Sequence, residues 1–444
     1  MQYGGGVMER SESLGSDDSQ LQQPRVFFGW WVVFAATGAT FLHGSVYLYG
    51  LGALFTPIRE DTGWSRGEIS IAISLATLAG GLAGPFAGSL IDRYGPRVMQ
   101  LYATASLGLG FILLSAADSL FEFYAVFLVF MGVAYAIGGI GLAPIATVAN
   151  WFVRKRSTAL GIAATGWGPG GIVWPLVIVA IVPLWGWQWS AVAAGALIWV
   201  LGTPLALLLR HRPERYGLLP DGDTPEGSMT VPSGHTSAPS AATAEPDFRL
   251  GEALRTPAFW LLTLTLSLGF MVTPAIGLHQ IPFLIESGYE PVAAAAVLGG
   301  MTMLSIPGRL VFGWLGDRYD MRLLVIVSLL LQTAGLLVLV VATQLWHLLA
   351  YAVIFGTGFG GLRPLSAALP ASYFGRTAYA SIRGAASSVQ VGLTMAAPVL
   401  TGVIADATGS YATAFAVLAA INTIGALTAF AMRPPSPRST APTG

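Results

Sequence analysis

Long apolar runs dominate the sequence and set its expected fold. Stretches of about 20 mostly apolar residues recur from Phe27 to Met432, and each can cross a hydrocarbon layer of ~30 Å as a helix that rises 1.5 Å per residue. We count twelve such runs, six on each side of a polar segment, and predict an all-α membrane protein with twelve transmembrane helices. The expected helices cover residues 28–55, 68–90, 98–117, 121–147, 158–182, 188–209, 258–284, 293–315, 322–342, 346–371, 384–406 and 411–432.

Polar segments flank and divide the apolar runs. The central one is rich in Pro, Gly, Ser and Thr and has no sustained apolar period, which is typical of a linker. After it, Leu250, Ala253 and Leu254 favour a short helix at the membrane face before Pro257. The expected organisation is a disordered cytoplasmic tail (1–25) without a secretory signal, a six-helix bundle (26–212), a cytoplasmic linker (213–252), a second six-helix bundle (253–433) and a cytoplasmic tail (434–444).

Composition and charge narrow the class of protein. The chain is 54% hydrophobic and 10% charged, against roughly 25% charge in soluble domains. A net charge of zero argues against nucleic acid as a partner, and the lack of cysteine excludes disulfides and thiolate metal sites. If the N-terminus is cytoplasmic, only Arg59 and Arg66 of the 22 Lys and Arg lie in outer loops and only Arg309 and Arg363 lie inside helices, which leaves 18 on the cytoplasmic side. We therefore expect a multi-pass protein of the plasma (inner) membrane with both termini in the cytoplasm.

The two halves of the chain repeat each other. The expected helix 2 ends in GSLIDRYGPR (residues 88–97) and helix 8 in GWLGDRYDMR (residues 313–322), which share GxLxDRYxxR. Helix 4 carries GLAPIATVANWF and helix 10 carries GLRPLSAALPASYF, which align at Pro144 and Pro364. A duplicated six-helix unit with matching motifs indicates two pseudo-symmetric bundles, as in transporters.

With these motifs the chain resembles the major facilitator superfamily over residues 27–433. Within it, WFVRKRSTALGIAATGWGPG (residues 151–170), FGWWVV (28–33) and YFGRTAYASIRG (373–384) resemble the monocarboxylate transporter and oxalate/formate antiporter branch. The acidic residue that animal members carry just before helix 1 is missing. The resemblance implies two bundles that rock about a central substrate site and expose it to each side of the membrane in turn.

The repeated motif predicts a contact between bundles. Asp92 should face the positive N-terminal end of helix 11, which we expect near Gly384. The resemblance implies a latch that includes Arg93 and Arg97, with a pseudo-symmetric copy against helix 5. That copy consists of Asp317 and Arg318. The alternative is that these charges only direct membrane insertion.

Two arginines lie inside expected helices. An arginine at the bilayer centre costs at least ~2.5 to 3.5 kcal/mol on insertion scales, so one that persists has a partner or a function. The resemblance implies that Arg309 binds the substrate carboxylate, which its planar guanidinium matches in bidentate geometry. The alternative for Arg309 is an internal ion pair. Arg363, directly before Pro364, either binds a second anionic group or braces helix 10.

Helix 7 supplies the candidates for coupling. His279 and Glu286 are seven residues apart and so share one helix face. Resemblance to bacterial lactate transporters implies that His279 lies near the substrate and that Glu286 takes part in proton coupling, which requires a half-buried carboxyl. The alternative for Glu286 is a solvated acid in a loop. Tyr135 on helix 4 is a further candidate for the pocket.

Departures from the family pattern leave the coupling open. Ser305 stands where animal members carry an aspartate and Tyr49 where they carry a lysine, which weakens their proton relay here. His43 and His279 are lesser candidates for proton coupling beside Glu286. On helix 11, where dicarboxylate exchangers carry a lysine, we find only neutral polar side chains such as Ser387 and Gln390. This favours a monocarboxylate.

These observations together predict a secondary active transporter. Its expected partners are a small organic monocarboxylate, a proton and the lipid bilayer, and we expect a monomer without a cofactor. The alternatives are an anion exchanger or uniporter, and a non-transporting sensor of the same fold. An enzyme is not expected, because the sequence offers no nucleophile with a base, no metal cluster and no phosphate-binding loop.

Overall fold

A computed structural model describes residues 26–44, 46–139, 142–223 and 247–435. The expected tail at 1–25, all but the first two residues of the expected tail at 434–444, and most of the linker lie outside the described residues. The apolar runs form helices because in lipid every backbone polar group has to be satisfied within its own segment. No strand occurs in the described ranges, and the predicted all-α class is confirmed.

Six spans make up the N-terminal bundle. The first is interrupted by two π-helical segments, and the second bends by 55° between α3 and α4. The sixth span follows the fifth within α10, where the backbone breaks at Gly186 (φ 83°). In chain order the elements are α1 (Phe28–Ala39), η1 (Thr40–Gly44), η2 (Val46–Gly50), α2 (Leu51–Thr62), α3 (Arg66–Leu82), α4 (Gly84–Tyr94), α5 (Pro96–Leu114), α6 (Leu120–Val126), η3 (Phe127–Met131), α7 (Gly132–Ala134), η4 (Tyr135–Gly139), α8 (Leu142–Trp151), α9 (Arg156–Ala164) and α10 (Trp167–Leu208).

The C-terminal bundle consists of six long helices, α12 (Pro257–Glu286), α13 (Pro291–Gly316), α14 (Met321–Val340), α15 (Leu345–Phe374), α16 (Tyr379–Thr408) and α17 (Tyr411–Ala431). The linker contributes two short 3-10 turns, η5 (Pro213–Tyr216) and η6 (Pro220–Gly222), and the short helix α11 (Leu250–Ala253). Helix α11 forms where the sequence predicts it, directly before Pro257 begins α12.

Nine helices within the described residues are long and apolar enough to cross a membrane, or ten if the bent pair is one span. The interrupted run from α1 to α2, and α9 with the first part of α10, account for the other two expected spans. Twelve spans therefore agree with the predicted number, and their ends differ from the predicted ones by a few residues. The largest functional difference is at α16, which begins at Tyr379 and so includes Arg383.

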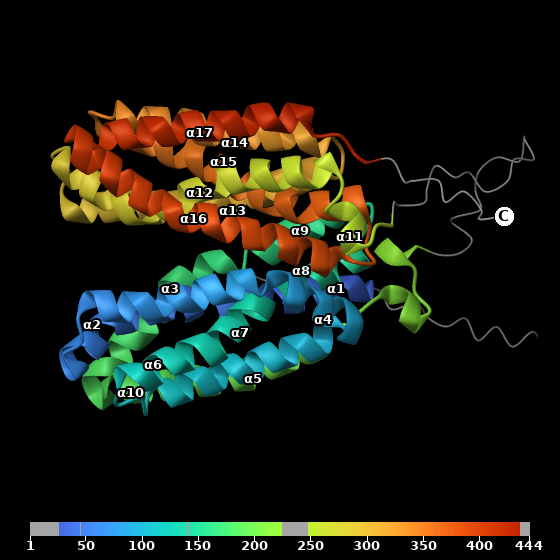
Figure 1. Cartoon of the computed structure of the whole chain (residues 1–444), viewed down its shortest axis with the longest axis horizontal. Coiled ribbons are helices and arrows are strands. Elements are labelled where there is room, and N and C mark those ends of the chain that lie inside the picture. Colours follow the sequence, from blue (N-terminus) through green and yellow to red (C-terminus); the bar gives the residue numbers. More distant parts are fainter. Residues whose placement is uncertain (1–25, 45, 140–141, 224–246, 436–444) are drawn as a thin grey trace, which may run out of the picture.

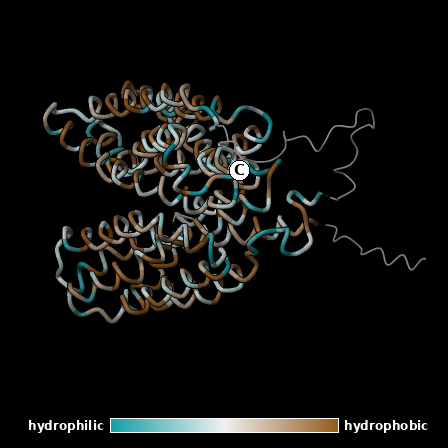
Figure 2. The backbone as a smooth tube through the Cα atoms, turned by 45° about the vertical axis from the view of Figure 1, so that its right-hand side comes forward, coloured by the Kyte–Doolittle hydropathy of each residue, from teal (hydrophilic) through white to brown (hydrophobic). Residues whose placement is uncertain are grey.

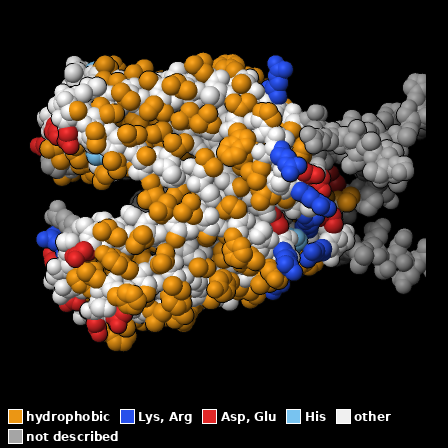
Figure 3. All heavy atoms as spheres, viewed as in Figure 1, with side chains coloured by type: hydrophobic (Ala, Val, Ile, Leu, Met, Phe, Trp, Pro, Cys, Tyr) orange, Lys and Arg blue, Asp and Glu red, His pale blue; other side chains and the backbone are white. Residues whose placement is uncertain are grey.

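The two bundles lie side by side, with the N-terminal bundle in blue to green and the C-terminal bundle in yellow to red (Figure 1). Hydrophobic residues run along the helices, and hydrophilic residues gather toward the ends and loops (Figure 2). The start of α1 and the end of α17 lie at one end of the molecule, where Lys and Arg side chains also gather (Figure 3). We call this the closed end, because the bundles meet there, and the opposite end the open end, because a deep hollow separates them there (Figure 3).

Candidate functional site

A cavity of about 260 Å³ lies between the two bundles. It is smaller than the ~300 to 1,000 Å³ typical of sites for drug-sized ligands, so it suits a small molecule. The N-terminal bundle contributes Tyr135, Ile145, Leu160, Ala164 and Trp167; the C-terminal bundle contributes Phe270, Thr273, Pro274, Arg363, Ser366, Ala367, Arg383, Ser387, Gln390, Val391 and Thr394. The candidates Tyr135 and Arg363 therefore line the cavity.

Aromatic rings hold the guanidinium of Arg363. Its Cζ lies 5.3 Å from the ring centroid of Phe270, 5.0 Å from that of Phe359 and 6.0 Å from that of Trp167. Such cation–π contacts stabilise a cation by about 0.5 to 2 kcal/mol each. Trp167 comes from the other bundle, so both bundles fix the position of this charge.

Arg383 is a second cavity cation, and the sequence analysis missed it. It lies in the second turn of α16, and its Nη1 donates to the carbonyl oxygen of Ser366 over 2.9 Å. The predicted start of helix 11 at Gly384 leaves Arg383 among the cytoplasmic charges. The inference that helix 11 contributes only neutral side chains to the cavity is therefore wrong. The sequence did hold one indication, because Arg383 directly precedes Gly384, the first residue of the expected helix.

Arg309 is buried beside the cavity and is not among its lining residues. Only 3% of it is exposed. Its Nη1 donates to the carbonyl oxygen of Ala164 over 2.7 Å, and its Nη2 donates to Ser305 Oγ over 3.1 Å. Because Ala164 belongs to α9, Arg309 joins the two bundles behind the cavity wall in this conformation.

The helix 7 candidates face away from the cavity. His279 Nε2 donates to the carbonyl oxygen of Pro398 over 2.9 Å, and its ring lies 5.4 Å from that of Tyr411. Thr273, which lines the cavity, is six residues from His279, so the two side chains lie about 120° apart around the helix. Glu286 ends α12 and is exposed, so the partial burial that we expected for its carboxyl is absent here.

Two partly buried carboxylates hold the bundles together at the closed end. Asp92 accepts hydrogen bonds from the backbone N–H groups of Ala380 (3.2 Å) and Ser381 (2.9 Å) and from Ser381 Oγ (2.6 Å). Asp317 accepts from the backbone N–H groups of Ser157 (2.7 Å) and Thr158 (3.0 Å). Each carboxylate thus satisfies the first N–H groups of a helix in the other bundle, where the helix dipole also favours negative charge.

The basic residues of the same motif lie outside these contacts. Arg93, Arg97 and Arg318 are exposed. Arg93 lies over the ring of Tyr94, and Arg318 lies over the ring of Trp314 at 4.0 Å. Burial raises the pKa of the Asp317 carboxyl, while the hydrogen bonds from Thr158 and Ser157 oppose that rise.

Small residues let the helices approach closely at the same end. A Cβ atom on Gly384 would lie 2.0 Å from the carbonyl oxygen of Gly84, and one on Gly88 would lie 2.2 Å from that of Ala380. On the pseudo-symmetric side, a Cβ atom on Gly313 would lie 2.8 Å from the carbonyl oxygen of Ser157. The closed end therefore depends on glycine at these positions.

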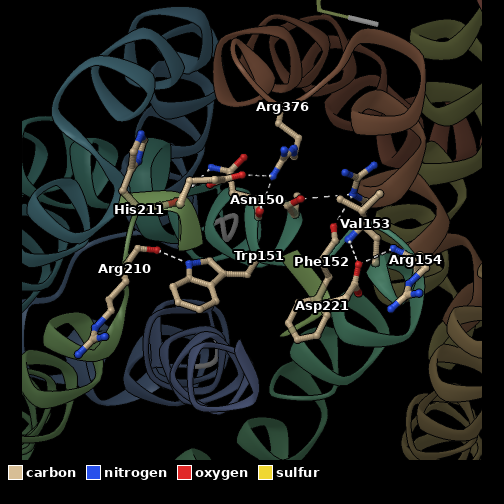
Figure 4. A network of polar contacts seen from close by, with 12 residues as sticks. Asn150, Trp151, Phe152, Val153, Arg154, Arg210, His211, Asp221 and Arg376 are labelled. Carbon is tan, nitrogen blue, oxygen red and sulfur yellow. Dashed lines mark hydrogen bonds and ion pairs between the residues drawn. The ribbon is translucent and has the colours of Figure 1, made fainter. Parts of the chain in front are cut away.

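The beginning of the linker packs against the N-terminal bundle (Figure 4). Asp221 accepts hydrogen bonds from the backbone N–H groups of Val153 (3.0 Å), Arg154 (2.9 Å) and Lys155 (3.1 Å), immediately before α9. Its φ of 60° places it in the left-handed region, which non-glycine residues rarely adopt. The Arg154 side chain also forms an ion pair with Asp223.

Arg376 connects the other bundle to this docked linker (Figure 4). It lies between α15 and α16, and its Nη1 donates to the carbonyl oxygen of Asn150 (2.9 Å) and to Glu214 Oε1 (3.1 Å). His211 is half-buried nearby, and burial, together with the charges of Arg215 and Arg212, lowers its pKa to about 4. The linker is thus part of the surface that the bundles share at the closed end.

Comparison with known proteins gives a family for this arrangement. The family model described as Major Facilitator Superfamily matches residues 26–393 and 288–444. Human monocarboxylate transporter 11 is 26% identical over 87% of this chain and 79% of its own length. The oxalate:formate antiporter of Oxalobacter formigenes is 24% identical over 52% of this chain and 50% of its own length. The fujikurins efflux protein of Gibberella fujikuroi is 29% identical over 65% of this chain, which spans 57% of that relative.

Solved structures agree on the fold. The human organic anion transporter MFSD10 (TETRAN) superposes with a TM-score of 0.65 at 15% identity, over 92% of this chain and 100% of its own. The Escherichia coli fucose:proton symporter FucP superposes with a TM-score of 0.62 at 18% identity, over 91% and 98%. At these identities the likeness supports the fold and no particular substrate.

Proposed function

Because this chain belongs to the major facilitator superfamily, we propose that it is a secondary active transporter of a small organic monocarboxylate. The observation that carries the proposal is the pair of guanidinium groups, Arg363 and Arg383, on one cavity between the bundles. A guanidinium presents paired N–H donors that match a carboxylate, and the interaction strengthens where water is excluded. Tyr135 then lies on the N-terminal wall of the same site.

In this proposal the cavity is exposed to each side of the membrane in turn. The contacts of Asp92 and Asp317 with helix N-termini act as latches that hold the present state, with Arg93, Arg97 and Arg318 as accessory charges around them. Opening the closed end separates α9 from α13, which breaks the bond from Arg309 to Ala164. We propose that the freed Arg309 then contacts the substrate.

The expected topology supports the direction of opening. Both described ends of the chain lie at the closed end together with most Lys and Arg side chains visible in Figure 3, so the positive-inside rule places that end in the cytoplasm of a plasma-membrane protein. Single cysteines can test this, because the chain has none of its own. A membrane-impermeant maleimide added to intact cells should label Glu290→Cys and spare Arg318→Cys; the reverse pattern would invert the topology.

Anion exchange is the second candidate function, and the position of Glu286 favours it over proton symport. Glu286 is exposed at the open end, and no acidic side chain is among the described residues that line the cavity. His279, bonded to Pro398, also lies outside the cavity. Uptake into proteoliposomes distinguishes the two modes. Symport predicts that an inward proton gradient drives accumulation of the carboxylate, and that Glu286→Gln abolishes this accumulation. Exchange predicts uptake only when the vesicles already contain a carboxylate.

Binding by the purified protein tests the proposal itself. We expect hexanoate or gluconate to raise the melting temperature, and we expect Arg363→Ala and Arg383→Ala to abolish the rise. Arg59→Ala removes an exposed guanidinium outside the cavity and serves as the control. If no carboxylate binds wild-type protein, or if both cavity variants bind like wild type, the proposal is wrong. Uptake into proteoliposomes would dismiss the non-transporting sensor.

A further inference from the structure

Three hydroxyl groups of the cavity donate their hydrogens to carbonyl oxygens of their own helices. Ser387 Oγ donates to the carbonyl oxygen of Arg383 (2.9 Å), and Ser366 Oγ donates to that of Arg363 (2.8 Å). Thr394 Oγ1 donates to the carbonyl oxygen of Gln390 (2.9 Å). A hydroxyl group has one hydrogen and two lone pairs. These three oxygens therefore offer only acceptor lone pairs to a ligand.

The hydrogen-bond acceptors of α16 lie in a row that begins with the guanidinium of Arg383. Arg383, Ser387, Gln390 and Thr394 all line the cavity from α16. Their spacing of four, three and four residues keeps them within about 60° of one another around the helix. The row extends about 16 Å along the helix axis, from the closed end toward the open end. One helix face thus presents a guanidinium followed by a series of hydrogen-bond acceptors, with the amide of Gln390 among them.

We propose that the cavity binds a polyhydroxylated carboxylate, such as a six-carbon aldonate. Its carboxylate contacts the guanidinium groups of Arg383 and Arg363, and its hydroxyl groups donate to Ser387, Gln390 and Thr394. This inference rests on the proposed function and narrows its substrate class. The cavity of about 260 Å³ accommodates such a small chain molecule.

The physical reason is that an apolar ligand would bury these acceptors without hydrogen bonds. A fatty carboxylate would satisfy the arginines but would displace water from the row of acceptors without replacing its hydrogen bonds. Sites built to hydrogen-bond a hydroxyl group reject analogues that lack it more strongly than apolar pockets reject an added hydroxyl. The aromatic rings of Trp167 and Phe270 do not reverse this preference, because they face the Arg363 guanidinium.

Gluconate and hexanoate form a matched pair of probes, with the same number of carbons and one carboxylate each. We expect wild-type protein in detergent to bind gluconate at least about 10-fold more tightly than hexanoate in titration calorimetry, and to bind sorbitol, which lacks the carboxylate, far more weakly. Ser387→Ala and Thr394→Val should each weaken gluconate binding about 3- to 10-fold, the range expected for one hydrogen bond. Neither should change hexanoate binding more than about 2-fold.

Thr401→Val is the control on the same helix. Thr401 Oγ1 donates to the carbonyl oxygen of Ala397 (2.8 Å), as Thr394 does to Gln390, but Thr401 is not among the residues that line the cavity. Its substitution should leave both affinities unchanged. Hexanoate binding as tight as that of gluconate, or equal losses for both ligands in the variants, would overturn the hydroxyl inference and leave the carboxylate site standing. Binding of neither carboxylate, or of sorbitol as tightly as gluconate, would overturn the proposed function as well.

Discussion

The substitution Gly384→Ala should open the closed end of the molecule. A Cβ atom at this position would lie 2.0 Å from the carbonyl oxygen of Gly84, 2.5 Å from its carbonyl carbon and 3.1 Å from the backbone nitrogen of Pro85. All three obstacles are backbone atoms, so no side-chain rotation can relieve the clash. Helices α4 and α16 have to separate by more than about 1 Å to restore ordinary contact distances, near 3.4 Å.

The expected size follows from this overpacking. Extra methyl groups forced into a packed interface cost about 1 to 3 kcal/mol. Only the state in which α4 contacts α16 has this clash, so the equilibrium between the two states shifts by the same free energy. Since 1.4 kcal/mol corresponds to a factor of ten, the present state should lose about 5- to 150-fold in relative population.

Double electron–electron resonance can measure that shift. Spin labels on Arg93→Cys and Thr377→Cys, both exposed at the closed end, should show a longer distance in the Gly384→Ala background. Gly392→Ala is the matched control on the same helix, because a Cβ atom at this position would have no neighbour within 4 Å. An unchanged distance distribution in Gly384→Ala, or an equal change in Gly392→Ala, would refute the close-contact argument.

Three further predictions concern the charged groups at the closed end. Asp92→Asn removes the charge that interacts with the N-terminus of α16, and it should shift the same label distances by the equivalent of about 0.3 to 1 kcal/mol; unchanged distances would leave the motif as an insertion signal. Arg376→Ala and Glu214→Gln should show a coupling free energy in a double-mutant cycle measured with these labels, of under about 1 kcal/mol because the ion pair is partly exposed. Strictly additive effects would mean that the linker does not stabilise the closed end. Burial lowers the pKa of His211 to about 4 from 6.5, so the unfolded chain binds a proton at this histidine before the folded protein does as the pH falls. His211 therefore contributes stability above pH 6.5 that is lost between pH 6.5 and 4. Over that pH range, the melting temperature of His211→Gln should fall less than that of wild type.

Much of the fold could be predicted because membrane helices are set by local composition. A run of about 20 apolar residues can satisfy its backbone only as a helix in lipid, so the twelve expected spans depend on no tertiary contact. The repeated GxLxDRYxxR motif likewise marked both Asp92 and Asp317 from the sequence. Each carboxylate contacts a helix N-terminus of the opposite bundle.

The sequence-based predictions failed where a residue distant in the sequence determines the local structure. Helix α16 begins at Tyr379 without a side-chain cap of its own, because Asp92 of the other bundle supplies the acceptors. A cap from 288 residues away leaves no local signal, so the sequence alone predicts a loop position for Arg383. The orientation of His279 depended in the same way on how α16 and α17 surround α12.

The distribution of charge between the bundles has a consequence for the transport cycle. Both guanidinium groups of the cavity, Arg363 and Arg383, belong to the C-terminal bundle, as does Arg309 behind the wall. The cavity residues contributed by the N-terminal bundle are uncharged in the part of the chain described here. In the proposed cycle, the N-terminal wall can therefore slide past a bound anion and exchange only apolar, hydroxyl and cation–π contacts, while the anion stays with its cations. Separating an anion from a guanidinium in a poorly hydrated cavity would cost far more than replacing such contacts. We therefore expect substitutions at Tyr135 or Trp167 to change the rate of exchange between states more than the affinity for the anion, and substitutions at Arg363 or Arg383 to do the opposite.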